Sequence, residues 1–240
     1  MFRIALFSAL LFLSSTVFAW DHVQGAGNVV RKPLAVQAFH GIRVEGALDV
    51  VITPASVQQV EVEAQENLVG LVTTSVQGGV WTIATSKGYS TNKPFVVHIR
   101  VPVIDVVEVE GSGDVKADGS FAAGDVKLGV QGSGDLDLAF TASRIDVRVQ
   151  GSGDVKLVGS CVELRAEVSG SGDVQARGLK AESVRAATAG SGNMVVYSTK
   201  RLNAAISGSG DITYAGDPAT VDTSVDGSGE VRALRTSGKL

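Results

Sequence analysis

The sequence has a single cysteine, Cys161, so a disulfide within the chain is excluded. We expect this cysteine to be a small buried side chain and the fold to depend on packing alone. Aromatic residues make up only 5% of the chain, which leaves no obvious stacking platform for sugars or bases. The net charge of −4 comes with no basic stripe, which argues against a nucleic-acid-binding surface.

Long apolar runs are also lacking beyond the N-terminus. Arg3 precedes an apolar stretch at residues 4–13, which is too short to span a membrane, and Val17-Phe18-Ala19 resembles a signal-peptidase site. These features predict a signal peptide at residues 1–19 and export to the periplasm, the cell surface or the medium. No cysteine follows the expected cut, so we do not expect a lipid anchor, and no membrane-spanning helix is expected in the mature chain.

Glycine, by contrast, is abundant, with 29 residues, and much of it belongs to one repeated motif. Gly-Ser-Gly-Asp begins at Gly111 and recurs with small changes at intervals of 18 to 21 residues. Repetition at a period near 20 is typical of solenoids, in which each repeat forms one turn of a stack. We expect the motif glycines to form a tight corner in each turn, because glycine adopts positive φ without strain. These corner residues are Gly111, Gly113, Gly132, Gly134, Gly151, Gly153, Gly170, Gly172, Gly190, Gly192, Gly208, Gly210, Gly227 and Gly229.

Apolar residues alternate with polar ones on both sides of each motif. In the six residues before each corner the even positions are largely apolar, as in Ile145, Val147 and Val149, and a shorter alternating segment follows it. This period of two predicts strands with one buried face, and a coil of about 19 residues can cover that face only by stacking on its neighbours. The sequence therefore predicts an all-β, single-domain parallel β-helix, with a right-handed sense and a short second strand, second corner and return segment in each coil.

The expected organisation is a signal peptide at 1–19, an N-terminal leader at 20–34, a β-helix domain at 35–236 and a tail at 237–240. Within the domain, residues 35–105 are less regular than the coils at 106–236. Gly46-Ala47-Leu48-Asp49 stands where a first, degenerate copy of the motif would fall. The strands between residues 53 and 105 are expected to form wider coils that cap the stack.

The acidic residue that ends each motif is the main candidate for chemistry. Stacked carboxylates about 4.8 Å apart could share a calcium ion, which favours several oxygen ligands. The alternative, which we favour, is that each side chain accepts backbone hydrogen bonds within its own corner, a role that Asn193 also fills. The calcium candidates are Asp114, Asp135, Asp154, Asp173 and Asp211.

Catalytic or cofactor-binding residues are not expected. The histidines, His22, His40 and His98, lie before the regular coils without metal-ligand or triad spacing. The charged outer positions mix signs, which favours cross-strand pairs over a focused site. Trp81 and Tyr89 could mark a binding surface, but packing in the core or cap is the favoured interpretation.

The repeated Gly-Ser-Gly-Asp-Val corners, together with the F-x-x-I-R-V-x-G-x-x-D-V opening at Phe39–Val50, resemble the head GIN domain family of autotransporter adhesin heads. The resemblance covers about residues 35–236. It implies a β-helix of the cell envelope or surface, with adhesion suggested by analogy. No translocator segment follows the last motif, so self-export is not expected.

The function that follows is an exported, non-enzymatic, adhesin-like interaction protein of the bacterial envelope. We expect no cofactor and no nucleic acid, a partner that is an envelope protein or a glycan, and possible self-association through end coils. Two alternatives stay open. One is a polysaccharide-active lyase or hydrolase that uses Arg165 or Arg185, and the other is a purely structural envelope scaffold.

Overall fold

The computed structural model describes residues 22–234, so the expected signal peptide at 1–19 and tail at 237–240 lie outside the described residues. Within this range the chain is all-β apart from one short 3-10 turn, which confirms the predicted class. The elements are β1 (His22–Gln24), β2 (Val29–Pro33), β3 (Gly41–Gly46), β4 (Asp49–Pro54), β5 (Gln59–Gln65), η1 (Val69–Leu71), β6 (Ser75–Gln77), β7 (Val80–Ile83), β8 (Gly88–Ser90), β9 (Val96–Val101), β10 (Val106–Gly111), β11 (Val115–Ala117), β12 (Phe121–Gly132), β13 (Leu136–Gly151), β14 (Val155–Gly170), β15 (Val174–Gly190), β16 (Met194–Gly208), β17 (Ile212–Ala215), β18 (Thr220–Gly227) and β19 (Val231–Ala233).

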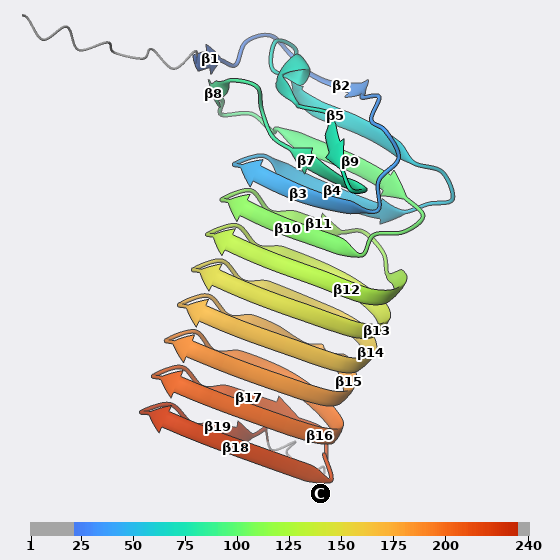
Figure 1. Cartoon of the computed structure of the whole chain (residues 1–240). Helices are drawn as coiled ribbons and strands as arrows, with labels where there is room; N and C mark the ends of the chain where they lie inside the picture. Colours follow the sequence, from blue (N-terminus) through green and yellow to red (C-terminus); the bar gives the residue numbers. More distant parts are fainter. Residues whose placement is uncertain (1–21, 235–240) are drawn as a thin grey trace, which may run out of the picture.

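Coils stack along one axis with parallel strands in register, and this confirms the β-helix (Figure 1). The segments before the corners form one wall, in the order β10, β12, β13, β14, β15, β16 and β18. The segments after the corners form the opposite wall. The core between the walls consists of the even-position side chains, such as Ile145, Leu164 and Val184, all fully buried.

Each corner is held by its glycines and by the corner below it. The first glycine of each regular motif has φ between 121° and 140°, a region that side chains rarely adopt. Its carbonyl oxygen accepts two hydrogen bonds from the next coil: Gly132 O, for example, takes Ser152 N–H at 2.8 Å and Gly153 N–H at 3.1 Å. The second glycine has no positive φ but is required by close approach, since a Cβ on Gly153 would collide with the Gly134 carbonyl oxygen.

The second corner differs from the prediction of a separate short strand and return segment. From β13 to β16 the chain after the motif stays in strand conformation through this bend, which gives single strands of 15 to 17 residues. Gly159 has a φ of 119° at this bend, whereas Gly178 is not in the positive-φ region. Differences in coil length are absorbed here, because the register between β15 and β16 shifts between Ala176 and Lys180.

The first coil confirms that Gly46 begins a degenerate copy of the motif. Gly46 has a φ of 98°, and β3 pairs in register with β10 so that Gly46 lies opposite Gly111. Strand β4 pairs with β11 in the same way. Residues 55–105 are therefore an insertion between two stacked coils.

This insertion closes the N-terminal end of the stack. Strands β7 and β9 pair in parallel with β3 and β4 and form a wider terminal coil, in which residues 84–95 replace the four-residue corner. Antiparallel strands then cover this coil: β5 pairs with β9, β2 with β5, and β6 with β7. The expected leader at 20–34 is thus not merely a leader, since β2 belongs to the cap.

Trp81 is part of the cap core and not of a binding surface. Its side chain is fully buried, its ring lies 5.3 Å from that of Phe39, and its Nε1–H donates to Thr73 O at 2.9 Å. Cys161 is buried as expected, and burial, with Glu163 nearby, raises the pKa of its thiol to about 11. The thiol is therefore protonated at neutral pH and a poor nucleophile.

Candidate functional site

The acidic column forms a continuous hydrogen-bonded ladder along one edge of the stack. Each carboxylate accepts the backbone N–H of the corresponding residue in the next coil: Asp154 N–H donates to Asp135 Oδ1 at 2.8 Å, and Asp173 N–H to Asp154 Oδ1 at 2.8 Å. The side chain does accept a backbone hydrogen bond, as the favoured interpretation requires. The donor lies in the neighbouring coil, however, so the expectation of a bond within the same corner was wrong.

Asn193 shows what this ladder requires chemically. Its N–H donates to Asp173 Oδ1 at 2.7 Å, and its own Oδ1 accepts Asp211 N–H at 3.0 Å. Its Nδ2 also donates to Asp173 Oδ1 at 3.2 Å. The ladder therefore needs a side-chain oxygen at a fixed distance from the backbone, and the negative charge is dispensable.

The calcium candidates share this geometry, because Asp114, Asp135, Asp154, Asp173 and Asp211 each have one oxygen in the ladder. Among residues 22–234, no group of three or more His, Cys, Asp or Glu residues is arranged to hold a metal ion. The hydrogen bonds to backbone N–H groups are therefore sufficient to explain how these side chains are arranged.

Replacing Asp154 by alanine should lower the free energy of unfolding by about 1.5–3 kcal/mol, the scale of a hydrogen bond to a charged acceptor. Asp154→Asn should cost much less, since Asn193 already fills the same role. Chemical unfolding of the two variants measures the difference. Equal losses for alanine and asparagine would show that charge, and not the acceptor oxygen, matters here.

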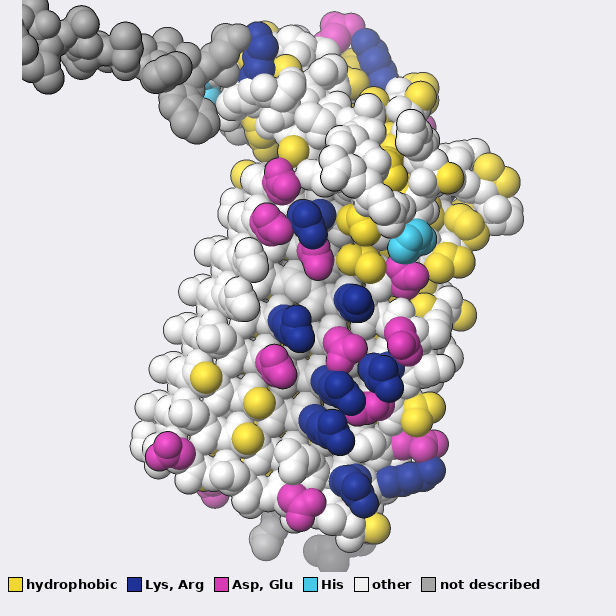
Figure 2. Space-filling model, viewed as in Figure 1, with side chains coloured by type: hydrophobic (Ala, Val, Ile, Leu, Met, Phe, Trp, Pro, Cys, Tyr) yellow, Lys and Arg dark blue, Asp and Glu magenta, His cyan; other side chains and the backbone are white. Residues whose placement is uncertain are grey.

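On the outer face of the wall formed by β10, β12 to β16 and β18, positively and negatively charged side chains are intermixed (Figure 2). The sequence predicted cross-strand pairs along the column Lys127, Asp146, Arg165 and Arg185, but the ion pairs lie in the columns beside it. Within residues 22–234, neither Lys127 nor Arg185 has an ion-pair partner within 4.0 Å, and the pairs lie instead at Arg144, Arg148 and Arg165. Arg165 donates to Glu163 of its own strand at 2.9 Å.

Glu163 is the centre of one of these charge clusters. It accepts from Arg165 Nε at 2.9 Å and from Arg144 Nε at 3.2 Å, which ties β13 to β14. The hydrogen bond from Arg165 holds the pKa of the Glu163 carboxyl below its ordinary value of 4.5; Arg144 lowers it further and burial opposes the shift.

This shift makes a pH-dependent contribution to stability. Because the pKa is lower in the folded than in the unfolded chain, the stabilisation is complete above pH 4.5 and is lost as the pH falls through the folded pKa. We expect Glu163→Gln to destabilise the protein more at pH 7 than at pH 3, as measured by chemical unfolding at both values. Glu167→Gln is the control, since Glu167 is 66% exposed and 3.7 Å from Arg148. A Glu163→Gln loss of the same size at both pH values would contradict this.

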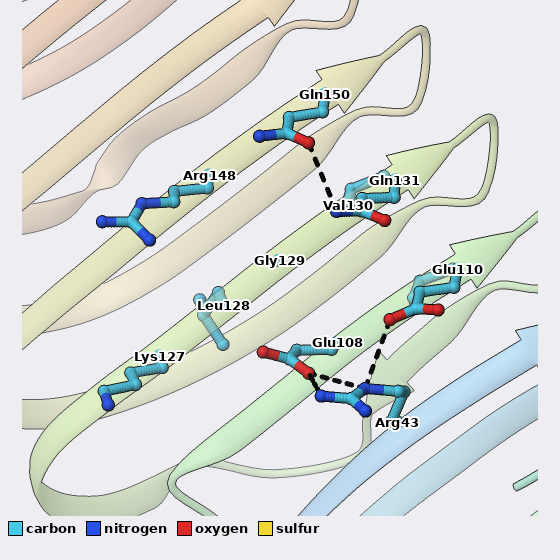
Figure 3. A pocket seen from close by; sticks show the side chains of 11 residues that line it. Arg43, Glu108, Glu110, Lys127, Leu128, Gly129, Val130, Gln131, Arg148 and Gln150 are labelled. Atoms are coloured by element: carbon cyan, nitrogen blue, oxygen red, sulfur yellow. Dashed lines mark hydrogen bonds and ion pairs between the residues drawn. The ribbon is translucent and has the colours of Figure 1, made fainter. Parts of the chain in front are cut away.

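A depression interrupts the outer face at Gly129. The residues three before each corner glycine form a column that runs from Glu108 through Gly129 to Arg148 and Glu167. Gly129 has no side chain, so a notch of about 260 Å³ opens between Glu108 and Arg148 (Figure 3). We call this the Gly129 notch; it is lined by Arg43, Glu108, Val109, Glu110, Lys127, Leu128, Gly129, Val130, Gln131, Arg148 and Gln150.

Opposite charges occupy different sides of the notch. On one side Arg43 binds both acidic residues, with Nη2 2.7 Å from Glu108 Oε2 and Nε 3.3 Å from Glu110 Oε1. The cations Lys127 and Arg148 lie on neighbouring strands across the notch, as Figure 3 shows. Arg43 carries one positive charge against the two carboxylates of Glu108 and Glu110, so the acidic side keeps a net charge of −1. On the basic side Arg148 is paired with Glu167 at 3.7 Å, and Lys127 is the cation that offers its charge to a ligand.

The amides of Gln131 and Gln150 complete the lining. Gln131 Nε2 donates to Gln150 Oε1 at 3.2 Å, which leaves the Gln150 amide nitrogen and the Gln131 oxygen at the rim. The main chain beneath is rigid, because Leu128 and Val130 on either side of Gly129 point into the core. The notch can thus hold a small polar group between cations and amides without rearranging the sheet.

Sequence reasoning did not single out the notch. The available signal was a glycine at an outward position between charged residues of the same column, in a chain where glycine otherwise marks corners. Two of the three histidines that it did consider have structural partners: His40 Nδ1 lies 2.7 Å from Asp105 Oδ1 and His98 Nε2 lies 2.9 Å from Glu63 Oε2, whereas His22 is exposed on β1. Arg165 and Arg185, the residues of the enzyme alternative, are adjacent in register on β14 and β15.

Comparison with solved structures shows the fold in other bacterial proteins. A putative adhesin from Bacteroides fragilis NCTC 9343 is 24% identical with a TM-score of 0.82, covering 88% of this chain and 100% of that one. A putative lipid binding protein from Parabacteroides distasonis ATCC 8503 is 21% identical with a TM-score of 0.71, covering 89% and 100%. A putative adhesin from Parabacteroides merdae ATCC 43184 is 23% identical with a TM-score of 0.68, covering 90% and 100%.

No protein of curated function matches the chain. Among residues 22–234, no helix is long and apolar enough to cross a membrane. A family model does match, over residues 38–218, and its range takes in the first coil, the cap insertion and the coils through β17. On that match, which spans most of the sequence, the chain belongs to the family described as "Putative auto-transporter adhesin, head GIN domain".

Proposed function

We propose that this protein is exported and acts as a non-enzymatic, adhesin-like interaction module of the bacterial envelope. The family description and the signal-like segment at residues 1–19 support this assignment. The observation that carries it is the Gly129 notch, a polar recess on a rigid outer sheet that is lined by Lys127, which has no ion-pair partner among residues 22–234, and by Arg148.

We infer that the notch takes an acidic sugar at the end or side of a glycan. A carboxylate is the group that Lys127 and Arg148 recognise best, because charge-assisted hydrogen bonds are about twice as strong as neutral ones. The Gln131 and Gln150 amides provide donors and acceptors for sugar hydroxyls. The volume, about 260 Å³, limits the inserted group to a single small unit.

Rigidity favours such a role. Binding to a site that is already in place avoids the cost of ordering loops. The notch lies on β12, which is paired with β10 on one side and with β13 on the other. Exposed cations also make the interaction dependent on ionic strength, because salt screens exposed charges beyond a Debye length of about 8 Å at physiological ionic strength. Weak binding per site is consistent with adhesion, where many copies act together.

Filling the notch tests the proposal. Gly129→Thr adds a side chain at a position with ordinary φ, where a Cβ would meet only the side chain of Glu108, with Cγ at 3.4 Å and Cβ at 3.9 Å. On an array of glycans bearing uronic or sialic acids, we expect the parent protein to bind and Gly129→Thr to bind at least about tenfold more weakly, a loss of 1.4 kcal/mol or more. Lys127→Ala should weaken binding as well and reduce its salt dependence.

The matched control is Ala205→Thr, in the same outward column of β16 but four coils away. It adds the same side chain outside the notch and should bind like the parent. Equal binding by all three proteins, or binding to neutral glycans only, would contradict the proposal. Release of shortened or unsaturated products from acidic polysaccharides, lost on changing Arg165 or Arg185, would instead establish the enzyme alternative.

A further inference from the structure

The two ends of the stack are finished differently. At the N-terminal end the cap closes the core: Val62, Leu68 and Trp81 are fully buried. The outermost strand there, β2, ends in Pro33 and carries Lys32, and both residue types discourage further strand pairing. Another chain is therefore poorly placed to add to this end.

The C-terminal end is open within residues 22–234. Strand β18 pairs with β16 on one side only, and all eight of its residues are exposed. Val221 and Val225 continue the core columns of Leu202 and Ile206, yet they are 40% and 46% exposed, against 0% and 3% for the residues below them. The C-terminal end therefore exposes both an unpaired backbone edge and part of the hydrophobic core.

We propose that this end binds the same end of a second copy, so that two β18 strands pair antiparallel about a two-fold axis. An axis relating identical edges makes the pairing antiparallel, and residues directly opposite then lie on the same face of the sheet. Core-facing residues must meet core-facing residues for the two interiors to join. This requirement leaves few registers that pair most of the strand.

The sequence of β18 selects one of them. With the axis at Thr223, Val221 lies opposite Val225 of the second copy, and Asp222 lies opposite Ser224, so no two carboxylates face each other. With the axis at Asp222, that residue would face itself, and with the axis at Ser224, Asp222 would face Asp226. Like charges directly opposite are destabilising. The register centred on Thr223 places Val221 against Val225 on the inside and is free of direct charge repulsion.

Cysteine cross-linking tests this register. In a Cys161→Ala background, Thr223→Cys would face its own copy at a separation that allows a disulfide, since opposite Cβ atoms lie about 4.5–5.5 Å apart and small shifts close the bond. We expect mild oxidation to convert the Thr223→Cys protein to a covalent dimer. Ser224→Cys should cross-link poorly; efficient linking there would indicate the competing register and overturn the one proposed.

The state of the uncross-linked protein is the second measurement. By light scattering over a range of concentrations we expect twice the chain mass, falling to the chain mass for Val225→Lys, which places a charge in the joined core. Val162→Lys is the control, because Val162 is 54% exposed in the middle of the stack. A monomer at every concentration without cross-linking overturns the proposal. The proposal is also overturned if the full chain is monomeric by light scattering while a chain ending at Leu234 dimerises. Residues 235–240 would then be the segment that occupies this edge.

Discussion

Gly151→Ala is expected to destabilise the protein by roughly 2–6 kcal/mol, the sum of a backbone strain and an overpacking cost of about 1–3 kcal/mol each. The first cost arises because Gly151 has a φ of 133°, which alanine adopts only under strain. The second arises because the new Cβ would press on the carbonyl oxygen of Gly132. That oxygen also accepts two hydrogen bonds from the next corner, so it cannot move away without breaking them.

Gly124→Ala is the matched control for this prediction. Gly124 lies in β12 at an ordinary φ, and a Cβ there would meet nothing within 4 Å. We expect the midpoint of chemical unfolding to stay unchanged or to rise slightly, because alanine restricts the unfolded chain. If Gly151→Ala were as well tolerated as Gly124→Ala, the corner glycines would not have the structural role assigned to them.

Phe140→Ala is the second large effect, with an expected loss of about 3–5 kcal/mol for removal of a buried aromatic ring. Phe140 is fully buried, and its ring centroid lies 6.1 Å from that of Phe121 in the coil above. It occupies the column of the second corner, directly opposite Gly159 in register, so the ring fills space that the next coil leaves open. The neighbours are backbone and strand residues that cannot collapse into the cavity.

The size of the cavity can be separated from the loss of aromatic contact. Phe140→Leu retains much of the volume and should cost clearly less than Phe140→Ala. Val162→Ala, at a position 54% exposed, should have almost no effect. Thermal or chemical unfolding measures all three, and a Phe140→Ala loss below that of Phe140→Leu would show that the site relaxes around the missing ring.

The regular coils were predictable because one physical rule acts on every repeat. A 19-residue coil has one buried face, so the identity of Ile145, Leu164 and Val184 as core residues follows from alternation and spacing alone. The corner glycines follow from the same count. Where the coil length changes, as between Ala176 and Lys180, the second corner changes with it, and no local pattern marks that bend.

The cap could not be derived in the same way. Its strands pair across long stretches of chain, as β2 with β5 and β3 with β10, and alternation in Val80–Ile83 does not indicate which strand lies beside it. The wider coil was expected in outline, but its position above the first coil depends on contacts between distant segments. Such pairings are decided by the whole core and not by a local sequence signal.

The candidate site was hidden for a related reason. Glu108, Gly129 and Arg148 become neighbours only through register, and the notch is a missing side chain and not a motif. The ladder of acidic residues was closer to prediction, since Asn193 already indicated an acceptor role. Its donor was assigned to the wrong coil, because a hydrogen bond between equivalent residues can be seen only once the coils are stacked.

The insertion of residues 55–105 also bears on the order in which the chain can fold. The regular coils contact partners about 19 residues away, which favours rapid stepwise growth along the stack. The first coil is different, because β3 and β4 lie between strands that are synthesised later, β7 and β9 on one side and β10 and β11 on the other. The earliest part of the β-helix therefore acquires both of its neighbours only when residue 117 is available, and growth toward the C-terminus has a late starting point.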